Sequence, residues 1–188
     1  VTLNADSKIR YPAQFSGKDR QVLLEGEAFF DVAEDSLRPF IVKTNGMDVR
    51  VLGTCFNMKA YPDENQQTTL VRGAVEVSLN QQQVVLSPGE QVTCVEHELK
   101  VEQVDIHPYI AWKNERFVFE NEPLEDVLKK LERWYNIDVF IQNAALREMR
   151  FTGNLPKYEK IDKVLELLAL TTRVKFELNK RVLIVQLE

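Results

Sequence analysis

Hydrophobic and polar positions alternate along the first hundred residues with the two-residue period of β-strands. Between residues 21 and 35 the apolar side chains fall on even positions, at Val22, Leu24, Ala28, Phe30 and Val32. Side chains spaced in this way share one face of a strand. Further alternating runs, separated by turn residues, occupy 39–44, 47–61, 70–79, 84–95 and 99–106. The pattern predicts many short strands and no helix before residue 111.

Three glycines interrupt this strand pattern. Gly26 breaks the even-numbered row, which predicts a bulge or a close approach of two backbones. The apolar positions change parity around Gly53 and again around Gly73, which predicts corners where strands bend around a roll or cross from one sheet to another. We expect residues 1–107 to form an all-β domain. A sandwich, a jelly roll and a short β-helix would each satisfy the pattern.

The period changes to that of a helix within residues 111–142. The apolar residues that share one helical face are Leu124, Val127, Leu128, Leu131 and Tyr135. Acidic residues lie at the start of this segment and basic residues towards its end, as the helix dipole favours, and Pro123 is expected in the first turn. Because strand-like runs at 117–119 and 137–141 flank the helix, the segment predicts a β-α-β unit.

A second unit of the same kind follows. A strand-like run at 151–155 precedes a helical pattern at 160–172, whose apolar face is Ile161, Val164, Leu165, Leu168 and Thr172. Two further strands are expected at 174–178 and 182–187. A shift of 37 residues superposes Val127 on Val164 and Ile137 on Val174, which indicates an internal repeat. We therefore expect residues 111–188 to form a second domain of two β-α-β repeats plus a final strand, giving an α+β protein overall.

Composition narrows the classes of protein that remain. A length of 188 residues suits one large domain or two small ones. The net charge of −5, with basic residues scattered along the chain, argues against nucleic acid as a partner. No run approaches the ~20 apolar residues of a membrane span. The chain begins at Val1 in the middle of a pattern, so we expect a fragment whose targeting or membrane segment lies upstream.

Motifs for catalysis or metal binding are missing from the sequence. His97 lies in a polar, turn-like stretch and His107 precedes a proline, and neither has a second histidine three or four residues away. No G-x-S-x-G motif or phosphate-binding glycine loop is present. Glu25 and Glu27 share one face of a strand, where a solvent-facing pair is favoured over a glycosidase dyad. We expect neither an enzyme, nor a metal, nor a cofactor.

The cysteines and tryptophans have ordinary interpretations. Cys55 and Cys94 lack partners at metal-ligand or redox spacing, so two buried thiols are favoured, with a disulfide as the alternative. Trp134 lies at the edge of the helical apolar face, where core packing is favoured over glycan contact. Trp112 is expected to anchor the junction between the two domains.

Several stretches together resemble a known family. RYPAQFSGKDRQVLLEGEAFFDVAED (10–35), PFIVKT, VRVLGTCFNMKAYPDE, TTLVRGAVEVS and LSPGEQV are similar to the periplasmic domain of FecR-type anti-sigma factors. The stretch 111–143, with MRFTGN and VLELLALTTRVKFEL, resembles the C-terminal domain that Bacteroidetes members of the family carry. That domain is in turn similar to the short N-terminal signalling domain of secretins and TonB-dependent transducers.

The resemblance implies a regulator that spans the inner membrane. A cytoplasmic segment, absent from this chain, would bind an extracytoplasmic-function sigma factor, and an upstream helix would cross the membrane. The present chain would be the periplasmic part, which receives a signal from a TonB-dependent outer-membrane transducer by protein–protein contact. The family supplies no catalytic residues. The alternative function is a glycan-binding or structural module at the cell surface.

Exposed strand edges offer one way to meet such a partner, because an extended segment can add to them as a further strand. We expect the transducer's signalling domain to pair with a strand edge of the second domain. The residues concerned lie on or beside the first strand of each β-α-β unit, at Arg116, Phe117 and Val118 and at Arg150, Phe151 and Thr152. The alternative is that these edges pair only within the chain.

Overall fold

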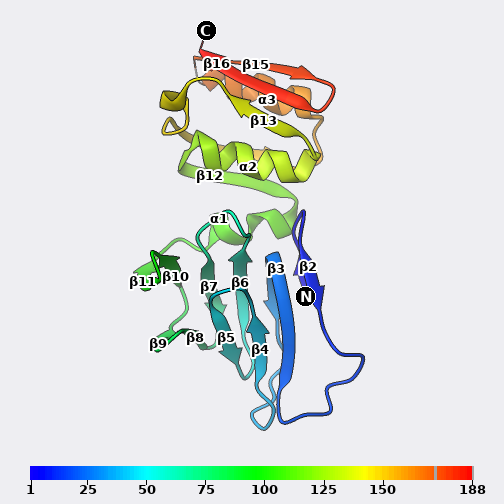
Figure 1. Cartoon of the computed structure of the whole chain (residues 1–188), viewed down its shortest axis with the longest axis vertical. Helices are drawn as coiled ribbons and strands as arrows, with labels where there is room; N and C mark the ends of the chain where they lie inside the picture. Colours follow the sequence, from blue (N-terminus) through cyan, green and yellow to red (C-terminus); the bar gives the residue numbers. More distant parts are fainter. Residues whose placement is uncertain (172, 188) are drawn as a thin grey trace. The chain divides into compact units, whose positions relative to one another are not determined.

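The computed structural model describes residues 1–171 and 173–187. The chain divides into two compact units, Val1–Lys113 and Asn114–Glu188, and strands dominate both (Figure 1). Thr172, which the helical pattern placed on the second apolar face, lies outside the described residues.

The first unit is built from strands, followed by a short helical segment. Its strands are β1 (Thr2–Leu3), β2 (Lys8–Arg10), β3 (Arg20–Asp31), β4 (Phe40–Lys43), β5 (Asp48–Val51), β6 (Cys55–Ala60), β7 (Gln67–Arg72), β8 (Val75–Leu79), β9 (Gln82–Leu86), β10 (Glu90–Val95) and β11 (Glu98–Gln103). Helix α1 (His107–Ile110) and the 3₁₀ turn η1 (Ala111–Asn114) follow. The prediction of no helix before residue 111 was therefore wrong. A four-residue helix is too short to show a period, although Pro108 in its first turn is a known start signal.

The strands form one eleven-stranded sheet that curls on itself. Its order is β11-β10-β7-β6-β3-β4-β5-β8-β9, with β1 and β2 paired to β3. The end strand β9 lies beside β10 and β11, so the sheet is nearly closed. The sequence left a sandwich, a jelly roll and a short β-helix open, and the structure shows a single, nearly closed sheet, which we call the roll.

The glycine corners predicted from the pattern are confirmed. Gly26 divides β3 into a first half that pairs with β4 and a second half that pairs with β6. Its φ is +97°, and a Cβ atom there would lie 2.7 Å from the Cα of Ser7. Gly53 and Gly73 separate β5 and β8, which pair with each other, from β6 and β7, which also pair with each other. A Cβ on Gly73 would lie 2.9 Å from the Gly53 carbonyl oxygen, so the two corners touch.

The even-numbered apolar residues of β3 point into the core of the roll, as predicted. Phe30 is fully buried and stacks on Phe56, with ring centroids 4.9 Å apart. Met47, Met58, Leu70 and Leu86 complete the largest buried side chains of this core. The alternation along the sequence thus becomes one buried face of the sheet.

The second unit repeats the order strand, helix, strand. Its elements are β12 (Arg116–Pro123), α2 (Leu124–Tyr135), β13 (Asp138–Ile141), the 3₁₀ turn η2 (Ala144–Leu146), β14 (Arg150–Pro156), α3 (Ile161–Thr171), β15 (Val174–Asn179) and β16 (Val182–Leu187). The first residues of α2 and α3 are 37 positions apart, as the repeat requires. Pro123 ends β12 and is the N-cap of α2 rather than part of its first turn.

The strands of this unit form two small sheets, so the two predicted β-α-β repeats are not confirmed. β12 pairs antiparallel with β14, while β13 pairs parallel with β16 and β15 pairs antiparallel with β16. The strands on either side of each helix therefore belong to different sheets. Hydrophobic periods locate strands but do not encode which strand is the partner, so the sequence could not supply this pairing.

The apolar stripes of the two helices form the core of the second unit, as predicted. Leu124, Val127, Leu128 and Leu131 of α2 are buried. Val164, Leu165 and Leu168, the α3 residues related to three of these by the 37-residue shift, are buried as well. Asn136, in the left-handed conformation, ends α2 and turns the chain into β13.

Candidate functional site

The six residues predicted to meet a partner lie on β12 and β14, which pair with each other. Arg116, Arg150 and Thr152 are exposed, whereas Phe117, Val118 and Phe151 are buried. One edge of each strand is thus used inside the unit. In the described part of the chain each strand has a single ladder partner, so the opposite edges of β12 and β14 carry no ladder. Contact of a partner with these edges stays a prediction.

The exposed polar side chains of this pair hold the two strands together. Arg116 donates to the side-chain and backbone oxygens of Asn154. The register shifts at Asn121, which has a φ of +48°. The Asn121 N–H donates to Thr152 Oγ1 (2.9 Å), and the Asn121 carbonyl accepts from the Arg150 guanidinium (3.1 Å). Two of the three predicted residues of β14, Arg150 and Thr152, therefore fix the bulge of β12.

Behind these strands lies an aromatic cluster around Trp134. Its ring meets Phe117 edge-on, with centroids 6.2 Å apart, and its indole N–H donates to the Lys157 carbonyl (2.6 Å). The Lys157 ammonium lies 3.8 Å from the Trp134 ring centroid, a favourable cation–π distance. Core packing of Trp134 is confirmed. Trp112 donates to Asn57 within the first unit (3.2 Å), and its predicted role at a junction stays a prediction.

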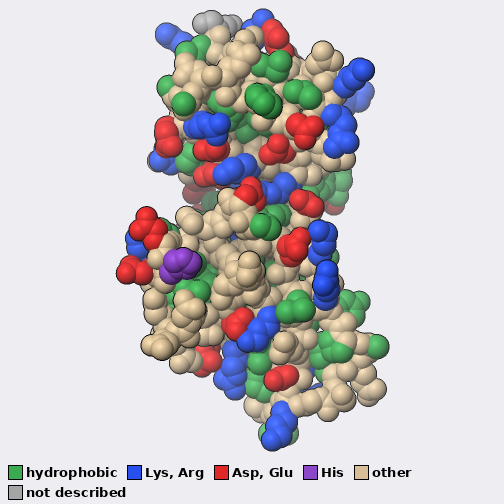
Figure 2. All heavy atoms as spheres, viewed as in Figure 1, with side chains coloured by type: hydrophobic (Ala, Val, Ile, Leu, Met, Phe, Trp, Pro, Cys, Tyr) green, Lys and Arg blue, Asp and Glu red, His purple; other side chains and the backbone are tan. Residues whose placement is uncertain are grey.

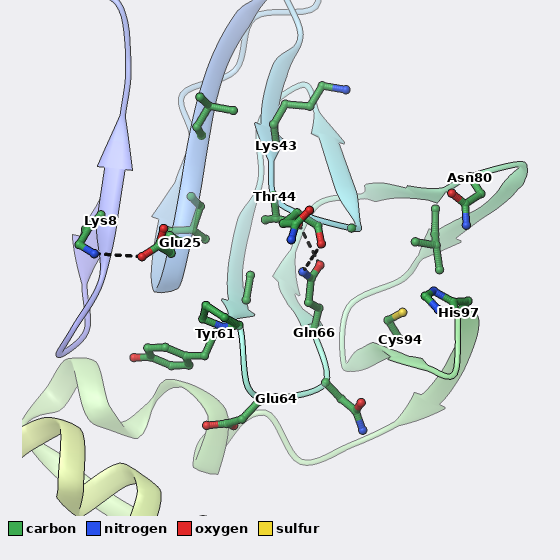
Figure 3. A pocket seen from close by; sticks show the side chains of 18 of the residues that line it. Lys8, Glu25, Lys43, Thr44, Tyr61, Glu64, Gln66, Asn80, Cys94 and His97 are labelled. Carbon is green, nitrogen blue, oxygen red and sulfur yellow. Dashed lines mark hydrogen bonds and ion pairs between the residues drawn. The ribbon is translucent and has the colours of Figure 1, made fainter. Parts of the chain in front are cut away.

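A cleft of about 840 Å³ opens on the first unit (Figure 3). Its walls come from β2 and β3, the β4–β5 turn, the β6–β7 loop and the turns of the β8–β9 and β10–β11 hairpins. Sequence reasoning missed this cleft, because its lining extends from Lys8 to His97 and only the fold gathers it. The asparagines at the turns were readable, but as turn formers rather than as a site.

The charged residues that line the cleft are balanced in sign. Gln66 is central to the cleft: its side-chain oxygen accepts from the Thr44 hydroxyl and the Met47 N–H, both at 2.9 Å. Three basic residues line the cleft (Lys8, Arg10, Lys43), and so do three acidic ones (Glu25, Glu64, Glu96). Two of the lysines are in ion pairs, Lys8 with Glu25 and Lys43 with Asp48. The hydrogen bond and charge of Glu25 raise the pKa of Lys8, so that lysine stays protonated.

The two cysteines are free thiols, as favoured from the sequence, but Cys94 is only partly buried. Cys55 is buried, and its Sγ donates to the Asp31 carboxylate (2.8 Å). Burial and the Asp31 charge raise the pKa of the Cys55 thiol, which keeps it in the unreactive protonated form.

Within residues 1–171 and 173–187, no three His, Cys, Asp or Glu side chains gather as metal ligands would. Basic and acidic side chains are interspersed over the visible face in Figure 2, without a patch of one sign. In the same described ranges, no helix combines the length and the apolar character needed to cross a membrane.

Two family models match the chain, one on each unit. Residues 1–76 match the family described as FecR protein, and residues 116–185 match FecR, C-terminal. Two crystal structures of a candidate anti-sigma factor from Parabacteroides distasonis ATCC 8503, at 1.65 and 2.50 Å, are 30% identical to it. They superpose with TM-scores of 0.90 and 0.89, covering 99% of this chain and 89% and 88% of theirs. None of the curated proteins matches.

A FecR domain followed by a FecR C-terminal domain defines a class of regulatory protein. The chain belongs to the FecR family, which confirms the resemblance read from its motifs.

Proposed function

We propose that this chain is the periplasmic sensor part of a transmembrane anti-sigma factor. It relays a signal from a TonB-dependent outer-membrane transducer towards an extracytoplasmic-function sigma factor by protein–protein contact. The observation that carries the proposal is the 30% identity, over 99% of the chain, to a structure described as a candidate anti-sigma factor. A regulator of this kind needs surfaces for partners rather than a catalytic centre.

We place the transducer contact on the second unit and treat residues 1–107 and 111–188 as separate domains. Here β12 and β14 each have one edge without a ladder partner among the described residues. An extended segment of the transducer's signalling domain can add to either edge through backbone hydrogen bonds. The side chains of Arg116, Arg150 and Thr152 hold the existing pair together, so they keep these edges in strand geometry before the partner arrives.

Binding to the purified signalling domain of the cognate transducer tests the proposal. Thr152→Pro removes a backbone N–H and the side-chain bond to Asn121, whereas Thr152→Val removes only the side-chain bond. We expect Thr152→Pro to weaken binding about tenfold or more and Thr152→Val to weaken it far less. Wild-type binding with no effect of Thr152→Pro, in a variant that folds, would remove the edge-strand contact. Absence of binding by the wild-type chain would remove the relay itself.

The cleft of the first unit favours a second candidate, a glycan-binding or structural module at the cell surface. Its lining has balanced charge and is rich in amide side chains, at Asn45, Asn65, Gln66 and Asn80, and such groups suit an uncharged ligand with many hydroxyls. Titration of neutral oligosaccharides against the chain, followed by calorimetry, tests this function. Saturable heat that is lost in Gln66→Ala would support it, and heats equal to buffer dilution would exclude it.

A further inference from the structure

The two ends of the eleven-stranded sheet come together without pairing. Strands β9 and β11 are the last strands at either end of the path, and β9 lies beside β10 and β11. In the residues that the structure describes, β9 has a ladder only with β8, and β11 only with β10. We call the line between β9 and β11 the seam. In the sequence, both strands of the seam lie between the two stretches that the family models match, 1–76 and 116–185.

The side chain of Gln82, on β9, crosses the seam to β11. The Gln82 side-chain N–H donates to the His97 carbonyl, and the Gln82 side-chain oxygen accepts from the Leu99 N–H, both at 3.1 Å. A neighbouring strand would offer β11 the same two groups, an N–H and a C=O. Gln82 therefore stands in for a strand at the start of β11. Asn80 and His97, which belong to the two hairpin turns at this end, lie on the same side of the cleft in Figure 3.

Beyond Gln82, the backbone edge of β11 is open. The two-residue turn Glu96–His97, with φ values of +51° and +66°, makes Val95 and Glu98 the closing pair of the hairpin. Hydrogen-bonded and non-hydrogen-bonded pairs alternate from there, so Leu99 and Val101 direct their backbone groups away from β10. The bond from the Leu99 N–H to Gln82 agrees with this alternation. Val101 therefore presents an N–H and a C=O to the seam.

The inner wall of the seam is apolar. Val101 is opposite Val92 and Val84 is opposite Val77, and both of these partners are fully buried. Because opposite residues in a ladder share a face, Val101 and Val84 face the core of the roll. Val101 is nevertheless 44% exposed. The core of the first unit thus reaches solvent at the seam, beside an unused backbone edge.

We infer that the seam accepts an extended segment of a partner protein, which adds to β11 as a further strand and displaces the side chain of Gln82. The segment carries apolar residues at alternate positions, because these would cover Val84 and Val101. Its other positions face the outer side, where Lys100 and Glu102 lie on β11. Opposite charges there, an acidic residue near Lys100 and a basic one near Glu102, complete the match. This site does not depend on the regulator role proposed above.

Selection from a phage-displayed library of random nonapeptides on the 1–188 chain tests the inference, with affinities of the selected peptides measured by fluorescence polarisation. We expect peptides with alternating apolar residues. Val101→Pro removes the outward N–H and leaves the bonds to β10, so it should weaken binding about tenfold. Val101→Thr keeps both the N–H and the branched side chain, and should bind within about threefold of the wild type.

A second pair of variants keeps the test decisive if Val101→Pro fails to fold. Gln82→Ala releases the His97 carbonyl and the Leu99 N–H, so it should strengthen peptide binding about threefold or more. Gln83→Ala removes the same side chain from the opposite face of β9 and should leave affinity unchanged. An empty selection, peptides without alternation, or equal affinities for the Gln82 and Gln83 variants would each overturn the inference. A dimer of the chain that Val101→Pro dissociates would also overturn it, because a second copy would then occupy the seam.

Discussion

The two units of this protein bury their apolar residues by different means. In the first, every second residue of a strand points inwards, and the sheet covers its own core by curling at three glycine corners. In the second, two helices lay apolar stripes against two small sheets. Both units therefore depend on buried side-chain volume, and the first depends in addition on backbone geometry at a few positions. Truncations of buried side chains and substitutions at a glycine corner should each lower the free energy of unfolding of the unit that contains them.

Each unit can be followed on its own, because Trp112 lies in the first and Trp134 in the second. Replacing either tryptophan by phenylalanine leaves fluorescence from the other unit alone. Urea unfolding of such single-tryptophan chains then gives the free energy of unfolding of one unit at a time.

The largest effect is expected for Phe30→Ala in the first unit. Phe30 is 0% exposed and packs against Phe40 and Phe56, so truncation leaves a cavity that costs about 4 kcal/mol. Urea unfolding followed by Trp112 measures the loss. Leu37→Ala, at a side chain that is 88% exposed, is the control and should change little. A comparable loss at both positions would contradict the assignment of the core.

The counterpart in the second unit is Leu131→Ala. Leu131 is fully buried on the stripe of α2, and we expect a loss of about 3 kcal/mol in the Trp134 transition. Leu170→Ala changes the same residue type in α3 at a position that is 77% exposed, so it serves as the matched control. If the Trp112 transition moved as much as the Trp134 transition, the two units would not unfold separately.

A glycine corner provides the third comparison. In Gly26→Ala the new Cβ would meet Ser7, in a backbone conformation that side chains disfavour, which should cost about 2 kcal/mol. Gly17→Ala, where the nearest atom would be 3.8 Å away, should be neutral or slightly stabilising. Thermal unfolding of the two variants, monitored at Trp112, distinguishes them. Equal effects would mean that the corner does not need glycine.

The smallest effect concerns Tyr135 and pH. Its hydroxyl donates to the Glu159 carbonyl (2.8 Å), so Tyr135→Phe should cost about 1 kcal/mol at neutral pH. Burial, and next the charge of Glu159, raise the pKa of Tyr135 above its ordinary value of 10.0. The folded unit therefore holds this proton more tightly than the unfolded chain, and its stability falls as the pH rises above 10.0. Tyr135→Phe should flatten that alkaline fall in the Trp134 transition, and an unchanged slope would contradict the role of Tyr135.

Much of the fold could be predicted from the sequence, because hydrophobic periods report which face of an element is buried. The even-numbered residues of β3, the stripe from Leu124 to Leu131 and the corners at Gly53 and Gly73 all follow from spacing. Partner choice between strands does not follow from spacing, since β13 and β15 have similar patterns but pair with β16 in opposite directions.

The candidate sites were harder to predict for the same reason. The polar residues of the β12–β14 pair could be named, but not their shared role at the Asn121 bulge. Gln82 lies in a polar run next to a turn, and no local signal distinguishes it from Gln83. Its role depends on the turn ends of two hairpins lying beside each other, because its bonding partners are 15 and 17 positions away in the sequence. The cleft depends likewise on turns from four hairpins.

The central place of β16 in its sheet sets the order in which the second unit can be completed. This strand lies between β13 and β15 and is the last of the three to be synthesised. Until residue 185 has been made, β13 lacks the ladder partner that it has among the described residues, and the side chains of Leu183 and Val185 are missing from the core. Completion of the unit therefore waits for the last strand to be translated. Truncation after Arg181 would remove this central strand, and with it the ladders to both β13 and β15.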